Sequence, residues 1–270
     1  MLTNYLSDQY KDLDGFISKE KNNYINADPF PHTVLNNFFN TNMIEQLLES
    51  FPKILEDSRD SMDWNTFHEK KITATPLQLK FDDKTFNFFN LLNSSYFLNF
   101  LQQISCIKEK LVPDPYFWGG GFCSVKRGGF LKIHSDFNTH PKLKLCRRIN
   151  VLVYLNKDWK EEYGGHLELW DRKMTACKKK IFPGFNDMVI FNTDDSSYHG
   201  HPSPLLCPED VRRNSVAMYY YTNGRPSSEI DINNVEHSTL WKNRMNLNEI
   251  DVVRVEYKKI FGKFYVKKKF

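Results

Sequence analysis

The stretch FLKIHSDFN, residues 130–138, is an apolar run that ends with a histidine and an aspartate two positions apart. Successive side chains of an extended strand point to opposite faces, so His134 and Asp136 share one face, about 6.6 Å apart along the chain. An imidazole and a carboxylate placed in this way can bind one metal ion together. Because two protein ligands alone bind a metal weakly, we expect a third ligand elsewhere in the chain.

The residues around this stretch form a series of short β-rich runs separated by Gly, Pro, Asn and Asp. The runs are YFWGGGFCSV, GGFLKIHSD, RRINVLVYLN, GGHLELWD, MVIFNT and RRNSVAMYYYT. Regularly spaced short strands are typical of a β-sandwich or barrel. We therefore predict a mostly β fold with flanking helices (α+β), whose core over residues 112–223 is a double-stranded β-helix, or jelly roll.

The two flanks of this core differ from it in composition. In residues 1–111, an alternating stretch from Pro31 to Phe39 predicts a strand, and apolar residues at helical spacing predict helices over 41–52, ended by Pro52, and over 96–111. We expect residues 1–111 to be a support packed on the core. The polar residues 224–270 are expected to form a C-terminal extension, so that the whole chain is a single globular unit.

Composition and charge limit the classes of protein and partner. The 270 residues are 40% hydrophobic and 15% aromatic, which fits a globular chain, and the net charge of +4 is too small to indicate a polyanionic partner. The exception is YKKIFGKFYVKKKF, residues 257–270. Aromatic residues among lysines can stack on single-stranded nucleic acid, but lysines also protect a terminal edge strand. We favour the edge strand or a solvated tail, and do not expect nucleic acid as a partner.

The cellular compartment is predicted from cysteines and from hydrophobic segments. The five cysteines include no CxxC pair and fit neither a disulfide framework nor a zinc finger, so we expect them to be reduced. The first residues lack the pattern of a signal peptide, and no apolar run approaches the ~18 residues of a membrane span. We predict a cytoplasmic protein without a membrane partner, as a monomer or weak dimer.

Four histidines of the β-rich region are candidates for the third ligand: His140, His166, His199 and His201. His199 in SSYHGHP follows one apolar strand and precedes another, so sheet pairing can bring it beside the strand that carries His134. Two histidines and one carboxylate form the facial triad of non-haem Fe(II) oxygenases, which leaves coordination positions open. Residue type alone does not decide between His199 and His201, because either can face a metal from an extended segment.

An arginine and a tyrosine of the same region could bind an anion. Arg213 starts the strand after His199, and a guanidinium can hold a carboxylate through two parallel hydrogen bonds. Tyr154 shares a strand face with Asn150, and its hydroxyl could donate to the same carboxylate. Arg212 adjoins Arg213, but alternation allows only one of the two to point inward.

Taken in order, these motifs resemble a known family. HxD at 134–136, RRINVLVYLNKDW, YGGHLELWD, YHGHP and RRNSVAMYYY are similar to the 2-oxoglutarate- and Fe(II)-dependent dioxygenases, in particular the prolyl-4-hydroxylase-like branch with its small bacterial and phage members. The similarity covers about residues 112–222. It implies that Fe(II) is bound by His134, Asp136 and His199. It also implies that Arg213 binds the far carboxylate of 2-oxoglutarate with the help of Tyr154, and it favours His199 over His201.

The resemblance also implies a reaction. Members of the family use Fe(II), 2-oxoglutarate and O2, with ascorbate as a possible reductant, to form succinate and to hydroxylate an unactivated carbon. Asp136 stands where halogenating members carry a small residue, so we expect hydroxylation, with no catalytic residue beyond the metal centre.

The expected substrate is a prolyl residue of a peptide or protein. A small molecule, such as a free amino acid or a nucleotide-sugar, and a glycan are alternatives. A non-catalytic jelly-roll ligand-binding module is the alternative from another class, but it would be favoured by the loss of a metal ligand or of Arg213, and neither is lost.

Two further motifs are interpreted as structural. His166 shares a strand face with Glu168 and Trp170, and we expect a histidine with ordinary hydrogen-bond partners rather than a second metal site. The glycines 119–121 lack the GK[ST] that completes a phosphate loop, so we expect a bend in the sheet or a close approach of backbone to substrate.

Basic and aromatic residues close to these motifs are interpreted in the same way. We expect Tyr219–Tyr221 to be ordinary core aromatics. A basic run after the HxD strand could steer an acidic substrate or form a solvated loop; it consists of Lys142, Lys144, Arg147 and Arg148.

Overall fold

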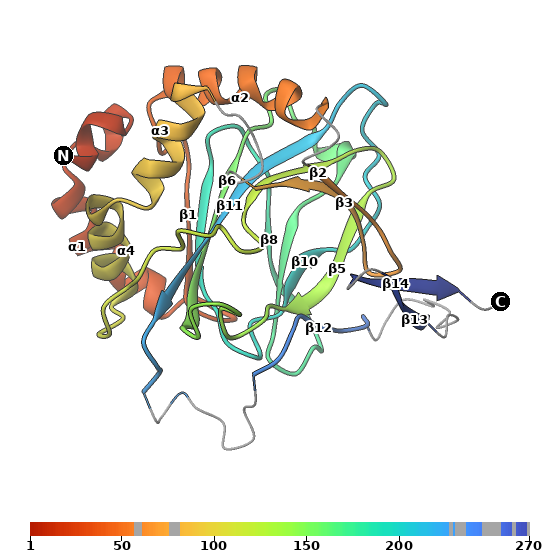
Figure 1. The fold of residues 1–270 in the computed structure, drawn as a ribbon. Helices are drawn as coiled ribbons and strands as arrows, with labels where there is room; N and C mark the ends of the chain where they lie inside the picture. The colour runs from red at the N-terminus through yellow and green to blue at the C-terminus, as the bar shows by residue number, and fades with distance from the viewer. Residues whose placement is uncertain are drawn as a thin grey trace.

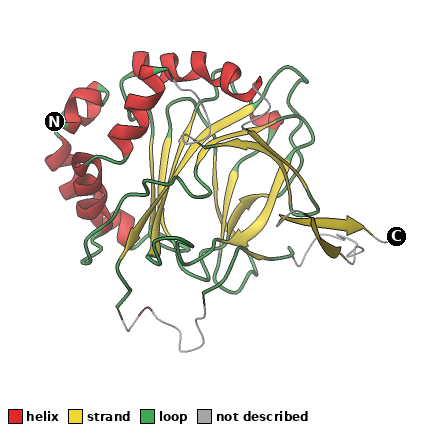
Figure 2. Cartoon of the chain, viewed as in Figure 1, coloured by secondary structure: helices red, strands yellow, loops and turns green. Residues whose placement is uncertain are grey.

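An antiparallel β-sheet built from strands distant in sequence is the framework of the molecule (Figures 1 and 2). The computed structural model describes residues 1–56, 61–75, 82–226, 229, 236–244, 255–260 and 263–268, with the side chains of 52–56 and of 255–268 left out. The helices are α1 (Leu13–Ile25), α2 (Thr41–Glu56), α3 (Asp83–Leu92) and α4 (Ser95–Ser105). The first eight strands are β1 (His32–Leu35), β2 (Ser61–Asn65), β3 (Glu69–Ala74), β4 (Gly121–Val125), β5 (Phe130–Ser135), β6 (Cys146–Tyr154), β7 (Leu167–Trp170) and β8 (Cys177–Ile181). The remaining strands are β9 (Met188–Asn192), β10 (His199–His201), β11 (Arg213–Thr222), β12 (Leu240–Trp241), β13 (Val255–Ile260) and β14 (Lys263–Lys268).

The strand order of the main sheet is β1-β9-β6-β11-β4-β3-β5-β10-β7-β8, with β2 beside β3 and β12 beside β5. Strand β3 pairs with both β4 and β5, and so joins the two halves of the sheet. The halves curl into a nearly closed barrel, and the predicted mostly β fold with a jelly-roll core is confirmed.

Alternation along the central strands separates an outer core from the interior of the barrel. In β6, Ile149, Val151 and Val153 belong to the core under the helices, whereas Leu152 and Tyr154 pack with the residues inside the barrel. Strand β9 alternates in the same way. In β11, Val216, Met218 and Tyr220 belong to the core under the helices, whereas Ser215, Ala217 and Tyr219 line the cavity inside the barrel. Both faces of these strands are buried, which explains their nearly continuous apolar sequences.

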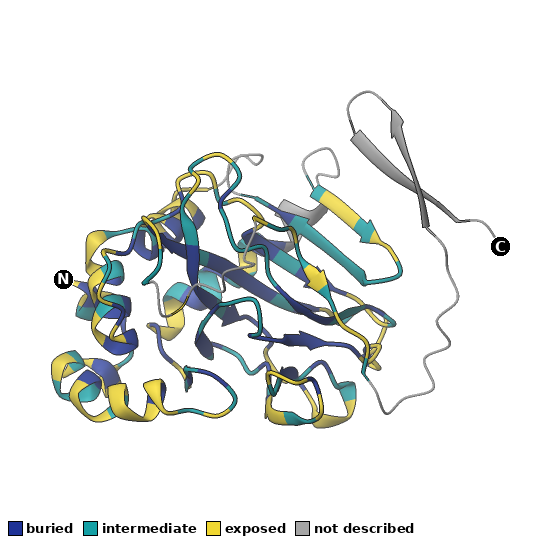
Figure 3. Cartoon of the chain, turned by 90° about the horizontal axis from the view of Figure 1, so that it is seen from below, coloured by how far each residue is buried: buried dark blue, intermediate teal, exposed yellow. Residues whose placement is uncertain are grey.

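The four helices cover the outer face of the half-sheet that contains β1, β9, β6 and β11 (Figure 1). Three of the helices begin with a side chain that accepts a hydrogen bond from the backbone three residues later, namely Asp12, Asp82 and Ser94. Such caps satisfy N–H groups that have no partner within the helix. The buried side of the helices packs on the sheet and the exposed side faces solvent (Figure 3).

Both predicted helix ends were wrong. Helix α2 continues past Pro52 to Glu56, although an interior proline removes one hydrogen bond and its ring crowds the carbonyl four residues earlier. The preceding turns bury Ile44 and Phe51 in the core, and this packing offsets the cost. Helix α4 stops at Ser105 instead of continuing to residue 111, since Cys106 adopts a left-handed conformation with φ 54° that ends the helix.

The segments outside residues 112–223 take part in the same sheet. Strand β1 pairs with β9, β3 pairs with β4 and β5, and β12 pairs with β5. The changes in composition near residues 111 and 223 therefore do not mark breaks in the sheet.

Strands β13 and β14 of the lysine-rich end are not part of this sheet. Strands β13 and β14 pair with each other as a sheet of two strands, while the lysine side chains on which the tail prediction depends lie outside the described residues. Within the described ranges, no helix combines the length and the apolar character that crossing a membrane requires.

The packing of the helices on the sheet can be tested with two residues of α4. Phe100 is 1% exposed and lies among Phe38 and Phe97, so Phe100→Ala should lower the free energy of unfolding by about 3–5 kcal/mol. Tyr96 on the same helix is 59% exposed, and Tyr96→Ala should change it by no more than about 0.5 kcal/mol. Urea denaturation measures the free energy of unfolding of both variants. Equal losses of this free energy in the two variants would contradict the described packing.

Candidate metal centre and cosubstrate site

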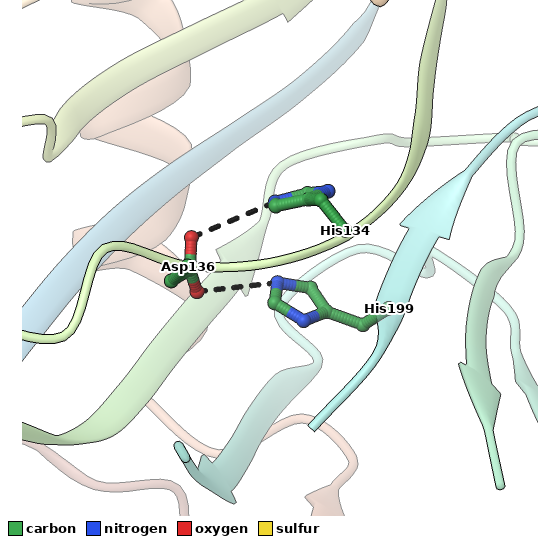
Figure 4. A group of neighbouring side chains, drawn as sticks. All are labelled: His134, Asp136 and His199. Atoms are coloured by element: carbon green, nitrogen blue, oxygen red, sulfur yellow. Dashed lines mark ion pairs between the residues drawn. The ribbon is translucent and has the colours of Figure 1, made fainter. Parts of the chain in front are cut away.

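Three of the predicted site residues meet inside the barrel. Potential ligand atoms of His134, Asp136 and His199 all lie within 4.8 Å of one another. The Nε2 atom of His134 is 3.5 Å from Asp136 Oδ1, and Nε2 of His199 is 3.4 Å from Asp136 Oδ2. Figure 4 shows both imidazoles directed at the carboxylate from neighbouring strands.

The hydrogen bonds of the two histidines leave the correct nitrogen available to a metal. The Nδ1 atom of His134 lies 2.8 Å from the carbonyl oxygen of Lys132, and Nδ1 of His199 lies 2.9 Å from that of Ser197. A carbonyl can only accept, so Nδ1 carries the proton in both rings and Nε2 keeps its lone pair in the neutral form. Such bonds fix the orientation of metal-binding imidazoles.

Gly200 allows the two histidine strands to approach each other. His199 pairs with His134, whereas His201 pairs with Leu131, so β5 contains one extra residue at this point. A bulge of this kind redirects side chains. A Cβ atom on Gly200 would lie 2.7–2.8 Å from backbone carbonyl oxygens of β5, closer than such atoms are found. Only glycine between the two histidines permits this pairing.

Asp136 follows the last residue of β5 and is held by Arg147 and Asn150. Arg147 Nη2 lies 3.0 Å from Asp136 Oδ2, and Asn150 Nδ2 donates to the same oxygen at 2.8 Å. Arg147 also donates to Asn150 Oδ1 through Nε and Nη2, and its guanidinium carbon lies 3.4 Å from the ring centroid of Tyr219. These contacts fix the carboxylate before any metal is bound.

The interpretation of Arg147 and Arg148 as residues of a solvated or substrate-steering loop was wrong. Both belong to β6 and are buried, Arg148 in ion pairs with Glu109 and Glu229. Strict alternation would place Arg147 on the face opposite Asn150. The pairing of β6 with β11 contains one extra residue between positions 147 and 149, and this bulge turns Arg147 inward.

The electrostatics of the centre favour the protonation states that a metal needs. Burial opposes ionisation of Asp136, but Arg147 and the two imidazoles outweigh it and hold the pKa of this carboxyl well below its usual range. Burial lowers the pKa of His199 to about 4, although Asp136 acts in the opposite direction. At neutral pH the site therefore presents a carboxylate and a neutral His199, as metal binding requires.

Arg213 and Tyr154 form the predicted pair inside the same cavity. Arg213 Nε donates to the carbonyl oxygen of Gly165 at 2.8 Å, and Nη2 donates to the Tyr154 hydroxyl at 3.3 Å. The other N–H groups of the guanidinium remain for a ligand. Gly165 has φ +75°, and a Cβ atom there would lie 2.9 Å from Arg213 Cδ, so glycine is required beside the arginine. Arg212 is exposed.

One cavity of 580 Å³ contains the metal centre and Arg213. Its wall includes eight aromatic residues, namely Trp64, Tyr116, Phe117, Trp118, Phe122, Phe137, Tyr219 and Trp241. Tyr219 lines this cavity and contacts Arg147, so its interpretation as an ordinary core aromatic was wrong. Tyr220 and Tyr221 are fully buried, as expected.

Sequence reasoning missed the contributions of the two flanking segments to this cavity. Trp64 belongs to β2, which the sequence did not predict, and Trp241 belongs to β12 in the C-terminal extension. The ring centroid of Trp241 lies 5.0 Å from that of His134 and 4.6 Å from that of His68. No local signal identified these residues, because strand pairing over long sequence distances brings them here.

The other candidate histidines lie outside the triad. His140 is buried in a pair with Asp114, and His166 pairs with Glu161 rather than with a metal-binding cluster. His201 lines the cavity, but the described residues contain one group of potential metal ligands, and it includes His199 instead. Burial, with Arg213 and Lys71 nearby, lowers the pKa of His201 well below its usual value and keeps the ring neutral.

Residues 120–221 match the model of a family described as the 2OG-Fe(II) oxygenase superfamily. Residues 120–221 form a 2OG-Fe(II) oxygenase domain. The predicted enzyme class and the cofactors Fe(II), 2-oxoglutarate and O2 are thereby confirmed. Two imidazoles and a carboxylate with open positions are also the donor set that such an oxygenase uses for Fe(II). A sequence search among curated proteins found no match.

Solved oxygenases share the fold of the chain. A prolyl hydroxylase from Trichoplax adhaerens, in complex with a hypoxia inducible factor peptide fragment, is 18% identical, with a TM-score of 0.57 over 80% of this chain and 94% of that chain. A prolyl-4-hydroxylase from Pseudomonas putida is 12% identical, with a TM-score of 0.52 over 77% and 99%. A 2OG-Fe(II) oxygenase family oxidoreductase from Burkholderia pseudomallei is 10% identical, with a TM-score of 0.54 over 77% and 92%.

The buried neutral His199 predicts a pH dependence of the metal-free oxygenase. Its pKa of about 4 lies below the value of about 6.5 in an unfolded chain, so the unfolded state takes up the proton first. The stability that this residue contributes is fully present above about pH 6.5 and is lost as the pH falls through about 4. His199→Gln should therefore flatten the decline of the free energy of unfolding between these pH values. Urea denaturation in the presence of a chelator measures the free energy of unfolding at each pH. Parallel curves of this free energy against pH for both proteins would contradict a buried, neutral His199.

Proposed function

We propose that this chain hydroxylates a prolyl residue of a peptide or protein, with His134, Asp136 and His199 as the ligands of Fe(II). The convergence of these three side chains with Arg213 in a single cavity carries the proposal. Bound Fe(II), together with 2-oxoglutarate and O2, supplies the oxidation of an unactivated C–H bond. The protein residues position these groups and no other residue acts as an acid or base.

Arg213 and Tyr154 hold the far carboxylate of 2-oxoglutarate in this proposal. Arg213 is buried and fixed by the Gly165 carbonyl, so its remaining donors are oriented before the ligand arrives. Burial raises the pKa of Tyr154, against the opposing effect of Arg213, so the phenol stays protonated and can donate. Charge-assisted bonds of this kind are strong in a buried site.

The mouth of the cavity supports a prolyl substrate. Tyr116 and Trp118 are large aromatic residues that line the cavity and are exposed, and Met62 is a third exposed residue of the same lining. Proline-rich segments bind aromatic-lined grooves because they are already extended and lose little entropy. The similarity in fold to the prolyl hydroxylases from Trichoplax adhaerens and Pseudomonas putida agrees with this substrate. A small molecule or glycan is the alternative that the same experiment tests.

The activity is tested by measuring succinate formed from 2-oxoglutarate in a screen of proline-containing peptides, amino acids and glycans. We expect a proline-containing peptide to stimulate succinate formation, and Asp136→Ala to abolish it because the metal loses its anionic ligand. Asp63→Ala, which removes an exposed carboxylate from β2 near the mouth, should leave the rate unchanged. Full activity of Asp136→Ala would contradict the ligand assignment, and stimulation by a glycan alone would contradict the prolyl substrate.

The role of Arg213 is tested by comparison with its neighbour. Arg213→Ala should raise the concentration of 2-oxoglutarate needed for half-maximal activity at least tenfold, since a buried bond to a charged group contributes about 1.5–3 kcal/mol. Arg212 is exposed, and Arg212→Ala should leave this concentration unchanged. Equal effects of the two variants would contradict a specific contact of Arg213 with the cosubstrate.

A further inference from the structure

His201 is a buried polar residue in the cavity that the proposed metal centre does not use. It is 4% exposed, it lines the cavity, and its Nδ1 atom has no hydrogen-bond partner in the described structure. A buried polar atom without a partner is costly, and its presence in a folded protein needs an explanation. The ring lines the cavity, so a ligand bound there can supply a partner for its N–H group.

His201 lies between the proposed metal centre and Arg213. His199 and His201 are two residues apart on β10, point to the same side and both line the cavity. In the antiparallel pairing with β7, His199 faces Leu169 and Gly200 faces Glu168. His201, the next residue of β10, therefore lies farther from the metal ligands and closer to the Gly165 end of β7, where the Gly165 carbonyl holds Arg213.

The charges around His201 indicate the kind of ligand. The cations that influence it are Arg213 and Lys71. Lys71 is already paired with Glu69 at 2.7 Å, whereas Arg213 bonds only to neutral oxygens of Gly165 and Tyr154. An unpaired buried guanidinium beside a neutral imidazole is complementary to a carboxylate, which accepts hydrogen bonds from both groups.

We propose that His201 donates a hydrogen bond to the far carboxylate of 2-oxoglutarate, beside Arg213. This inference rests on the proposed cosubstrate role of Arg213 and adds a second, uncharged donor. His201 is then a positioning residue for the cosubstrate, which explains why the sequence HGH contains two buried histidines although the metal needs only the first of them.

The test uses the full chain loaded with Mn(II), which permits binding without turnover, and measures dissociation constants by titration calorimetry. Two ligands are compared: 2-oxoglutarate and 2-oxopentanoate, which has the same carbon chain without the far carboxylate. His201→Val should weaken 2-oxoglutarate binding about tenfold, as expected for the loss of a bond to a charged group, and should leave 2-oxopentanoate and Mn(II) binding unchanged. His201→Asn keeps a donor and should recover most of the affinity, within about threefold of the unchanged protein.

His32→Val is the matched control, because His32 is a buried strand histidine that does not line the cavity. The affinity of this variant for 2-oxoglutarate should be unchanged. The inference would be overturned if His201→Val bound 2-oxoglutarate with unchanged affinity, or if its affinities for 2-oxoglutarate and 2-oxopentanoate fell by the same factor. Loss of Mn(II) would instead make His201 a metal ligand and also overturn it. If the unsubstituted protein bound Mn(II) but not 2-oxoglutarate, the proposed function itself would fail, and this outcome is distinct from a failure of His201 alone.

Discussion

The pairing of the three-residue strand β10 with β5 is the constraint on which the candidate site depends. It places His199 opposite His134, although 64 intervening positions separate them in the chain. A shift of register by one residue would turn His199 to the other face of the sheet. Gly200 permits the close approach, and the adjoining bulge in β5 directs His134 toward the same point.

A buried network prepares this site before a metal or a cosubstrate is bound. A carboxylate placed inside a barrel is costly unless it is paired, and Asp136 is paired with Arg147 and bonded to Asn150. Arg147 is in turn packed against the ring of Tyr219. The cavity thus contains two anchored arginines: Arg147 orients Asp136, and Arg213 has further N–H groups that can donate to an anion. Such preorganisation is what a site needs in order to hold reactants in a productive geometry.

Much of this arrangement was predictable from local sequence, because it follows from strand alternation. Period-two patterns identified the central strands and placed Tyr154 inside the barrel, and the order of motifs identified Arg213 rather than Arg212. The inward position of Arg147 was not predictable, because a single extra residue in β6 reverses the face that alternation assigns. Trp241 was missed for another reason: its place beside His134 depends on pairing between segments more than 100 residues apart.

The most direct test of the account is the position of a metal ion in a crystal of the protein grown with Mn(II) and 2-oxoglutarate, located by anomalous diffraction. We predict one strong peak within coordination distance of Nε2 of His134, the carboxylate of Asp136 and Nε2 of His199, with the dicarboxylate extending from it toward Arg213. A peak bound by His201 in place of His199, or one outside the barrel, would contradict it.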